Sequence, residues 1–395
     1  MTMFAGVQKL PDDPILKLSQ LYAADTRSPK VDVGVGIFQD EQGHTPVMRA
    51  VHAAEKRVWD KAESKKYRGV YGNLPFNQLL ATLVLGDFDK SRVRTIQAVA
   101  GTGALRLIGE GLRAMNAPKR LWVSDPTWGN HLPIFRACGF EIHTYPYYNR
   151  ETASLKREEF FAAMRQMGPE DIVLLHGCCH NPSGQDLSPA DWDELAAIAV
   201  ERGFLPLVDL AYLGFGEGLE ADAYGVRKMA ASVPNLFVAV SCSKNFGLYR
   251  ERVGLVIALG ENAEQADAIQ SQLGAASRAM VSMPPDHGAE VVATILGDAG
   301  LRGEWESELR EYCAYIHRRR EELAAALEQV TGTDWSFVVR HRGMFSLLPL
   351  GAERVGRLRE EFAIYVVGEG RINIAGLRSQ DAIDYFAGSV GKVMK

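Results

Sequence analysis

Between about residues 46 and 300, short apolar segments alternate with segments whose apolar residues recur at helical spacing. The runs "DIVLLH" (171–176), "FLPLVDL" (204–210) and "NLFVAVS" (235–241) are nearly continuous in apolar residues. Between the first two lies "SPADWDELAAIAVERG", which has Ser188 at the N-cap position and Gly203 at its end. Buried apolar strands that alternate with amphipathic helices are typical of a parallel sheet covered on both faces. The chain is therefore predicted to be an α/β protein.

The last part of the chain has a different pattern. A long charged helix is expected over residues 304–330, followed by short strands near residues 345–350, 362–367 and 371–377 and a closing helix. A chain of 395 residues is also long for a single core. We predict a large domain of residues 46–310, a smaller α+β domain of residues 15–45 and 311–395, and an extended arm of residues 1–14, either frayed or docked on a partner.

Charge and cysteine content exclude several classes of protein. The net charge is −5, and the basic cluster Arg318–Arg320 lies beside Glu321 and Glu322, so we expect it to form a solvated helix face. Neither a nucleic acid nor a membrane is an expected partner. The five cysteines lack zinc-ligand spacing, so no metal site is predicted and free thiols in the cytoplasm are expected. We find no signal peptide and no apolar run long enough to span a membrane.

Polar residues follow five of the predicted strands, at the points where the strands end. Open α/β sheets bind ligands at the carboxyl ends of their strands. The residues are Gly101, Thr102 and Gly103, then Trp128, then Asn181, then Asp209 and Tyr212, and finally Ser241, Ser243 and Lys244. We therefore expect a binding site at this edge of the sheet.

Lys244 stands between two core-like segments, "FVAV" (237–240) and "GLVIA" (254–258). A surface lysine in a turn is the ordinary alternative. A lysine held against an apolar wall has a depressed pKa, however, and its amine can form a Schiff base. The short connection at a sheet edge favours this second interpretation.

Asp209 and the glycine-rich turn at residues 100–109 indicate what kind of ligand would bind beside Lys244. Asp209 ends a buried strand, where a carboxylate is costly unless it caps a helix, forms an ion pair or pairs with a cationic ring nitrogen. The turn "AGTGALRLIG" (100–109) enters a helix and forms an anion site, to which Ser241 and Arg252 could contribute. A lysine for an imine, an acid for a pyridinium and a phosphate cradle together indicate pyridoxal 5′-phosphate.

The segment "SCSKNFGLYRERVG" (241–254) closely resembles the lysine motif of the aspartate/aromatic aminotransferases, the α branch of class I, which are pyridoxal-phosphate enzymes of fold type I. Eight more segments match the family in order: "VGVGIFQDEQG", "YRGVYGNLPF", "AGTGALR", "DPTWGNH", "LLHGCCHNPSGQ", "VDLAYLGFGEG", "RAMVSMPPDHGAEVV" and "GRINIAGL". The resemblance implies a large domain with a mostly parallel seven-stranded sheet flanked by helices, and a smaller α+β domain.

The resemblance also implies roles around the cofactor ring. Lys244 would hold the cofactor covalently and, once freed, move a proton between the substrate α-carbon and the cofactor C4′ atom. Asp209 would keep the ring nitrogen protonated. Asn181 and Tyr212 would hydrogen-bond the phenolic oxygen, and Trp128 would lie against the ring. Trp128 and Asn181 would also border the substrate.

Further roles concern the phosphate, the substrate and a second subunit. The phosphate would be held by Gly101, Thr102, Ser241 and Arg252. The family forms a homodimer with shared sites, in which Tyr67 of the neighbour would also reach the phosphate. Arg371 would bind the substrate α-carboxylate near the Gly36 backbone, and Arg278 of the neighbour would pair with a distal carboxylate. His131, His176 and His180 would lie behind these groups, and none is predicted to be catalytic.

Departures from the family pattern bear on specificity. Ala100 stands where many relatives have serine or glycine, and Val281 and Met283 replace an aromatic residue and an asparagine typical of dicarboxylate specialists. A buried arginine left unpaired costs about 3–5 kcal/mol, so a site that accepts both substrate types needs an Arg278 that can turn toward water. We predict an aminotransferase that uses tyrosine, phenylalanine or tryptophan and retains aspartate and glutamate activity, with 2-oxoglutarate or oxaloacetate as acceptor.

Other functions remain open at this point. A dedicated aspartate aminotransferase is the main alternative. A β-lyase or cyclopropane-forming synthase of the same fold is disfavoured by Arg278, which suits a second carboxylate. A nicotinamide-dependent dehydrogenase would not explain Lys244. In addition, the third glycine of the turn at residues 100–109 is displaced from its position in the dinucleotide-binding pattern. A transcriptional regulator would need a DNA-binding segment before the first matched block at residue 33.

Overall fold

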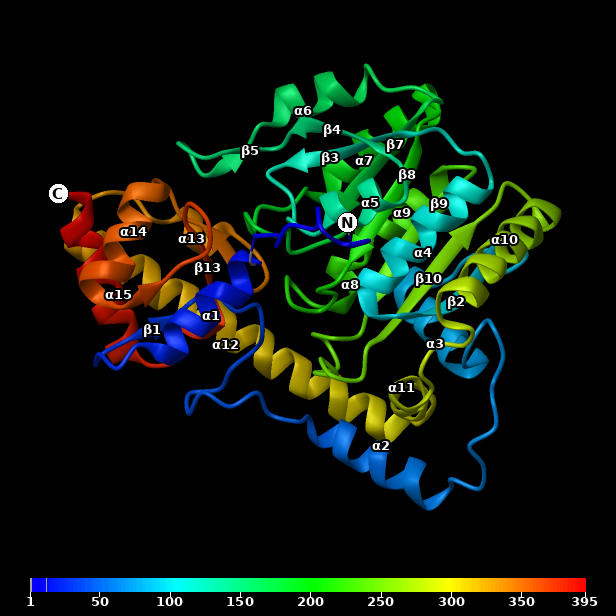
Figure 1. The fold of residues 1–395 in the computed structure, drawn as a ribbon, viewed down its shortest axis with the longest axis horizontal. Helices are drawn as coiled ribbons and strands as arrows, with labels where there is room; N and C mark the ends of the chain where they lie inside the picture. The colour runs from blue at the N-terminus through cyan, green and yellow to red at the C-terminus, as the bar shows by residue number, and fades with distance from the viewer. Residues whose placement is uncertain (1, 12) are drawn as a thin grey trace.

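A seven-stranded sheet organises the larger part of the molecule (Figure 1). The structure is a computed structural model that describes residues 2–11 and 13–395, so Met1 and Asp12 of the predicted arm lie outside it. The strand order is β2-β10-β9-β8-β7-β3-β4. The strands are β2 (Val93–Val99), β3 (Arg120–Asp125), β4 (Glu141–Pro146), β7 (Asp171–His176), β8 (Leu205–Leu210), β9 (Leu236–Ser241) and β10 (Val253–Leu259).

One strand of this sheet runs against the others, which refines the expectation of a parallel sheet. β10 is antiparallel to both β9 and β2, whereas β9, β8, β7, β3 and β4 pair in parallel. Parallel strands need a crossover of about a dozen residues or more. Residues 242–252 contain no helix and reverse the chain directly. As a result, the amino end of β10 lies at the same edge as the carboxyl ends of the parallel strands.

Both faces of the sheet are apolar because successive strand residues point to opposite sides. In β7, Ile172 and Leu174 join one buried cluster, and Val173 and Leu175 join the other. Helices α4 (Ala100–Ala114), α5 (His131–Ala137) and α10 (Ala263–Val281) pack on the first side. Helices α3 (Leu74–Leu85), α7 (Pro189–Arg202), α9 (Tyr224–Ser232) and α11 (His287–Gly297) pack on the second.

The predicted caps of α7 are present. Ser188 Oγ accepts a hydrogen bond from the Asp191 amide, and the Asp191 side chain accepts one from the Ser188 amide. Gly203 ends the helix at φ 75°, a left-handed conformation that glycine adopts without strain. Local sequence therefore determines both ends of this helix.

A long helix joins the sheet-bearing part to the C-terminal elements. In Figure 1, α12 (Ala299–Thr331) runs from the vicinity of α2 (Arg49–Asp60) and α11 to this second group. The group contains β1 (Val31–Asp32), α13 (Phe337–Arg340), β11 (Phe345–Leu347), α14 (Gly351–Phe362), β12 (Ile364–Tyr365), β13 (Arg371–Asn373) and α15 (Gln380–Met394). Because β1 pairs with β12, the start and the end of the chain meet here.

The remaining elements are short or peripheral. Described residues before α1 (Pro14–Ala24) are exposed and form no helix or strand, and Asp13 caps α1 by accepting from the Ile15 and Leu16 amides. Strands β5 (Tyr148–Asn149) and β6 (Ser154–Leu155) form a hairpin. Helices α6 (Arg157–Met164) and α8 (Leu219–Asp222), and the 3-10 turn at Ile374–Gly376, complete the described elements.

The prediction of a solvated arginine face on α12 is wrong for two of its three residues. Arg318 is exposed, but Arg319 is 6% and Arg320 only 1% exposed. Arg320 donates to the carbonyl oxygens of Val338, Gly343 and Phe345 and to the hydroxyl of Ser346. Consecutive helix residues point in different directions, so a run of like charges includes positions that face the core.

All five cysteines are free thiols, and all are buried. Among helices within residues 2–11 and 13–395, none combines the length and apolar character that crossing a membrane requires.

Candidate active site

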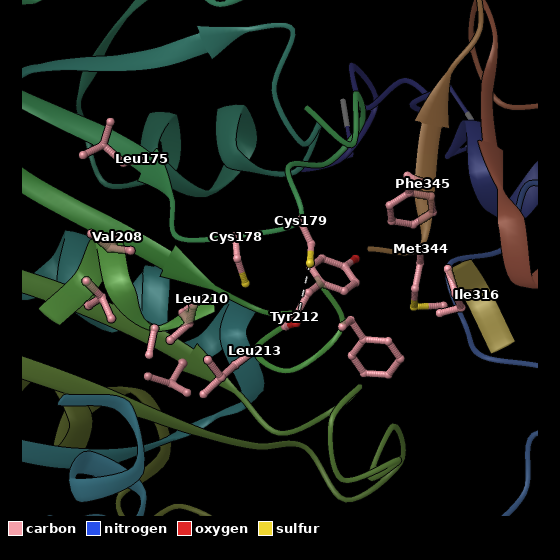
Figure 2. Close-up of a cluster of buried hydrophobic side chains, with 14 of the residues drawn as sticks. Leu175, Cys178, Cys179, Val208, Leu210, Tyr212, Leu213, Ile316, Met344 and Phe345 are labelled. Carbon is pink, nitrogen blue, oxygen red and sulfur yellow. Dashed lines mark hydrogen bonds between the residues drawn. The ribbon is translucent and has the colours of Figure 1, made fainter. Parts of the chain in front are cut away.

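A cavity opens at the sheet edge where the predicted site residues gather. It is lined by Gly36, Gly101, Thr102, Trp128, Asn181, Asp209, Tyr212, Ser241, Lys244, Arg252 and Arg371, together with eight further residues. The carboxyl ends of β7, β8 and β9 form one wall, and β11 and β13 of the C-terminal group form another. Figure 2 shows Tyr212, from the loop after β8, facing Phe345 of β11. The cavity thus lies between the two parts of the molecule.

Lys244 is partly buried in the turn after β9, with its Nζ atom 5.0 Å from the centre of the Tyr212 ring. Burial lowers the pKa of this amine to about 8; the charge of Asp209 opposes the shift and that of Arg252 adds to it. A lysine with a lowered pKa has a larger neutral fraction near neutrality, as nucleophilic attack on an aldehyde requires.

Asp209 is the last residue but one of β8 and is held by a buried histidine. His131 Nε2 lies 3.0 Å from Asp209 Oδ2, and Thr127 Oγ1 lies 2.8 Å from His131 Nδ1. Burial alone would raise the pKa of Asp209, but the hydrogen bond from His131 and the nearby charges outweigh it and lower the pKa. The site therefore holds a buried carboxylate in its charged form, suited to pair with a cationic nitrogen.

A small cradle forms where β2 turns into α4. Ala100 and Arg252 both have positive φ, 56° and 54°, and the Ala100 amide donates to the Arg252 carbonyl at 2.9 Å. A Cβ atom on Gly101 would lie 3.1 Å from the Ser241 Cβ atom, so glycine permits this approach. Ser241 Oγ lies 3.1 Å from Ser243 Oγ. A helix N-terminus, hydroxyls and a guanidinium are the groups that bind phosphate.

Arg371 points into the opposite side of the cavity from β13. Its Nη2 donates to the Gly34 carbonyl at 2.8 Å and its Nη1 to Asn181 Oδ1 at 3.3 Å. The guanidinium carbon lies 4.5 Å from the centre of the Phe345 ring. Its buried Nε has no hydrogen-bond partner within the described part of the chain. Gly36 is close by, since a Cβ there would be 2.9 Å from Phe345. Among the residues that the structure describes, no carboxylate pairs with Arg371, so its guanidinium is suited to bind a carboxylate ligand.

Two predicted residues do not join the others in this chain. Tyr67 is 90% exposed and lines a separate surface cavity, and Arg278 is exposed on α10. Neither lines the main cavity. Both were predicted to act in the site of a neighbouring subunit.

Sequence reasoning left several lining residues out of the predicted site. They are Ile15, Ala100, His176, Cys178, Ala211, Tyr249 and Phe345. Tyr249 lies five residues after Lys244, and Cys178 follows a predicted strand, so their positions could have identified them. Ile15 and Phe345 come from segments distant in sequence, and only the packing of α1 and β11 brings them here.

The donor groups fit pyridoxal 5′-phosphate. The cavity offers an amine for an aldehyde, a charged carboxylate for a ring nitrogen and an anion cradle for a phosphate, each from a different strand end. The fold and this donor set define a pyridoxal-phosphate enzyme of fold type I.

The chain belongs to the aminotransferase class I and II family, whose family model matches residues 28–390. It is 45% identical over 377 residues to an aromatic-amino-acid aminotransferase of Paracoccus denitrificans, covering 95% of this chain and 96% of that protein. It is 43% identical over 397 residues to an aspartate aminotransferase of Haemophilus influenzae, covering 99% and 100%. The structure of the Burkholderia pseudomallei aromatic-amino-acid aminotransferase, covalently bound to pyridoxal phosphate, matches with a TM-score of 0.96 at 40% identity, covering 100% of both chains.

Proposed function

We propose that this chain is a pyridoxal-5′-phosphate-dependent aminotransferase. It moves the amino group of tyrosine, phenylalanine or tryptophan, and also of aspartate or glutamate, to 2-oxoglutarate or oxaloacetate in a ping-pong reaction. The observation that carries the proposal is the meeting of Lys244, Asp209 and Arg371 in one cavity, which provides an amine, an anion and a carboxylate receptor. The family match and the names of the relatives support the reaction class.

In this proposal, different residues of the chain carry out different parts of the reaction. When bound, the cofactor supplies a ring that accepts the electron pair released at the substrate α-carbon. Lys244 anchors the cofactor and, as a free amine, carries the proton at that carbon. Asp209, held charged by His131, stabilises a protonated ring nitrogen. Tyr212 donates a hydrogen bond to the cofactor's phenolic oxygen, and burial raises the pKa of its own hydroxyl, which keeps this donor protonated.

Binding is assigned to groups at the two ends of the cavity. Ser241, Arg252 and the first turn of α4, with Gly101 and Thr102, hold the phosphate. Arg371 binds the substrate α-carboxylate, next to Asn181 and the Gly36 backbone. Trp128 covers the ring, and its own ring lies edge-on to His131 at 5.2 Å.

The active enzyme in this proposal is a homodimer in the cytoplasm. Tyr67 and Arg278 lie outside the chain's own cavity, which is consistent with their serving the partner's site. Exposed Met3, Phe4 and Val7 in the N-terminal segment provide apolar surface for docking on a neighbour. Residues 1–14 are assigned to an arm, residues 15–45 and 311–395 to a small domain, and residues 46–310 to a large domain.

Broad specificity rests on the surroundings of Arg278. Val281, 41% exposed, follows it on α10, and Met283 comes two residues after Val281. Neither side chain offers the hydrogen bonds that would fix a guanidinium in one position. Arg278 can therefore pair with a distal carboxylate or turn away from an aromatic ring.

A spectroscopic titration tests the proposal. Tyrosine, aspartate and alanine are added in turn to the purified holoenzyme while the cofactor absorption is recorded. Conversion of the aldehyde form to the amine form by tyrosine and by aspartate is expected, with comparable kcat/KM values. A preference for aspartate beyond about a hundredfold, some 2.7 kcal/mol, would instead indicate a dedicated aspartate aminotransferase.

The Lys244→Ala variant tests the assignment of the amine. It should lose the conversion and turnover, because no other amine lines the cavity among the described residues. Lys90→Ala, at an exposed position, is the matched control and should behave like the wild type. Wild-type turnover in Lys244→Ala would refute the proposal.

A further inference from the structure

Three potential metal ligands meet behind the active site. The ligand atoms of Cys178, Cys179 and Asp222 all lie within 4.8 Å of one another, and all three residues are buried. Cysteine spacing alone does not indicate this group, because the two thiols are adjacent in sequence and the carboxylate is more than forty residues away.

Backbone geometry places both thiols on one side. Adjacent residues in a strand point to opposite faces, but β7 ends at His176 and Cys179 adopts φ 52°. This left-handed conformation, costly for a residue with a Cβ atom, turns the second thiol toward the first. Figure 2 shows both sulfur atoms pointing toward the loop that carries Tyr212, and Cys179 Sγ lies 3.8 Å from the Tyr212 carbonyl oxygen.

The carboxylate is oriented by three backbone amides. Asp222 Oδ2 accepts from Gly214 at 2.8 Å and from Gly216 at 2.9 Å, and Oδ1 accepts from Glu217 at 2.8 Å. Oδ2 uses both of its lone-pair sites in these bonds, whereas Oδ1 keeps one for a cation, because a carboxylate offers about two lone-pair sites per oxygen. Hydrogen bonds of this kind fix the orientation of a metal ligand.

The group has a route to solvent that does not pass through the active site. Cys178 and Asp222 line a second cavity, which is also bordered by the carboxylates of Asp186, Glu217 and Glu220. Acidic side chains at its border raise the local concentration of cations. Arg340 and Arg342 also line this cavity, and Arg342 is paired with Glu217.

We propose that Cys178, Cys179 and Asp222 form a binding site for a soft divalent cation such as Zn²⁺ or Cd²⁺, with its fourth ligand position open to the second cavity. Two sulfurs and one oxygen suit such ions better than Mg²⁺ or Ca²⁺. A tetrahedral ion with metal–sulfur distances near ~2.3 Å needs sulfurs about 3.8 Å apart, which small side-chain rotations provide. Two metal–sulfur bonds form, and the two thiol protons pass to the buffer.

Titration of the reduced holoenzyme with CdCl₂ tests the site through the ultraviolet sulfur-to-cadmium absorption band. We expect one Cd²⁺ per chain with the band of two thiolates. Cys179→Ser should lose at least half of the band and bind about 100-fold more weakly, because it removes one of three protein ligands. Cys313→Ser is the matched control, since this buried thiol lies 3.9 Å from His317 Nε2 and offers a rival site.

Circular dichroism without cadmium establishes that each variant is folded. If Cys179→Ser is unfolded, Asp222→Asn takes its place, with unchanged thiols and at least tenfold weaker binding expected. The proposal is overturned if the folded variant binds Cd²⁺ like the wild type, if Cys313→Ser abolishes the band, or if the wild type shows no band at stoichiometric cadmium.

Discussion

His131 Nε2 lies 3.0 Å from Asp209 Oδ2 in the interior of the protein, and the other ring nitrogen of His131, Nδ1, lies 2.8 Å from Thr127 Oγ1. The histidine therefore donates to the carboxylate, and this contact keeps the pKa of Asp209 low against the effect of burial. A carboxylate that stays charged when buried is the group that a cationic ring nitrogen requires.

Asp209→Asn is expected to lower kcat/KM for tyrosine by at least ~100-fold, because a neutral amide cannot stabilise a protonated ring nitrogen. Steady-state kinetics with cofactor in excess measures the loss. Asp193→Asn, at an exposed position of α7, is the control and should change kcat/KM less than twofold. Equal activity in the two variants would contradict the role of Asp209.

The pKa of Lys244, lowered by burial to about 8, predicts how the apoenzyme takes up its cofactor. Only the neutral amine attacks the aldehyde, so the rate should rise with pH up to about 8 and then level off. Stopped-flow absorbance after mixing apoenzyme with pyridoxal 5′-phosphate gives the profile, with Nα-acetyl-lysine as reference. If the rate with the apoenzyme keeps rising to the same pH as the rate with Nα-acetyl-lysine, burial does not shift the pKa of Lys244.

Replacing Arg371 by lysine should weaken carboxylate binding. A lysine cannot bind a carboxylate through two parallel hydrogen bonds, and losing about 1.5–3 kcal/mol raises KM about 10- to 150-fold. We expect this rise for both the amino donor and the 2-oxo acid, since both carry the α-carboxylate. Arg318→Lys, at an exposed position of α12, is the control. An unchanged KM in Arg371→Lys would place the carboxylate elsewhere.

The Arg278→Met substitution should change kcat/KM differently for dicarboxylate and aromatic substrates. If Arg278 pairs with a distal carboxylate, kcat/KM for aspartate should fall at least ~30-fold, the effect of a lost charged hydrogen bond of about 2 kcal/mol. The value for phenylalanine should stay within about threefold, because its ring makes no ion pair. A parallel loss for both substrates, measured in the same assay, would indicate a structural role.

Arg320→Met should destabilise the fold. Its guanidinium donates four hydrogen bonds of 2.7–2.8 Å inside the protein, and their acceptors would lose these donors. The free energy of unfolding should fall by about 3 kcal/mol or more, as measured by urea denaturation of the holoenzyme. Arg318→Met, two residues before Arg320 on α12 but exposed, should change it by less than ~0.5 kcal/mol. Similar values for both variants would refute the structural importance of Arg320.

Much of the architecture could be predicted because it depends on local pattern. The apolar run ending at Ser241 forms β9, and Ser188 and Gly203 delimit α7 as expected. The C-terminal strands are shorter than their apolar runs suggested, with β11 limited to Phe345–Leu347. Strand ends depend on where a partner strand stops, which a single segment does not encode.

Local periodicity and residue chemistry therefore determined the α/β class, the order of the elements and the strand ends that carry Lys244, Asp209 and Asn181, because hydrophobic spacing and capping act over a few residues. Only the tertiary structure decided that Arg320 is buried, that Ile15 and Phe345 reach the cavity, and that Asp222 meets two thiols. These relationships join residues far apart in the chain. They depend on how packed elements meet in space, and no short stretch of sequence specifies that.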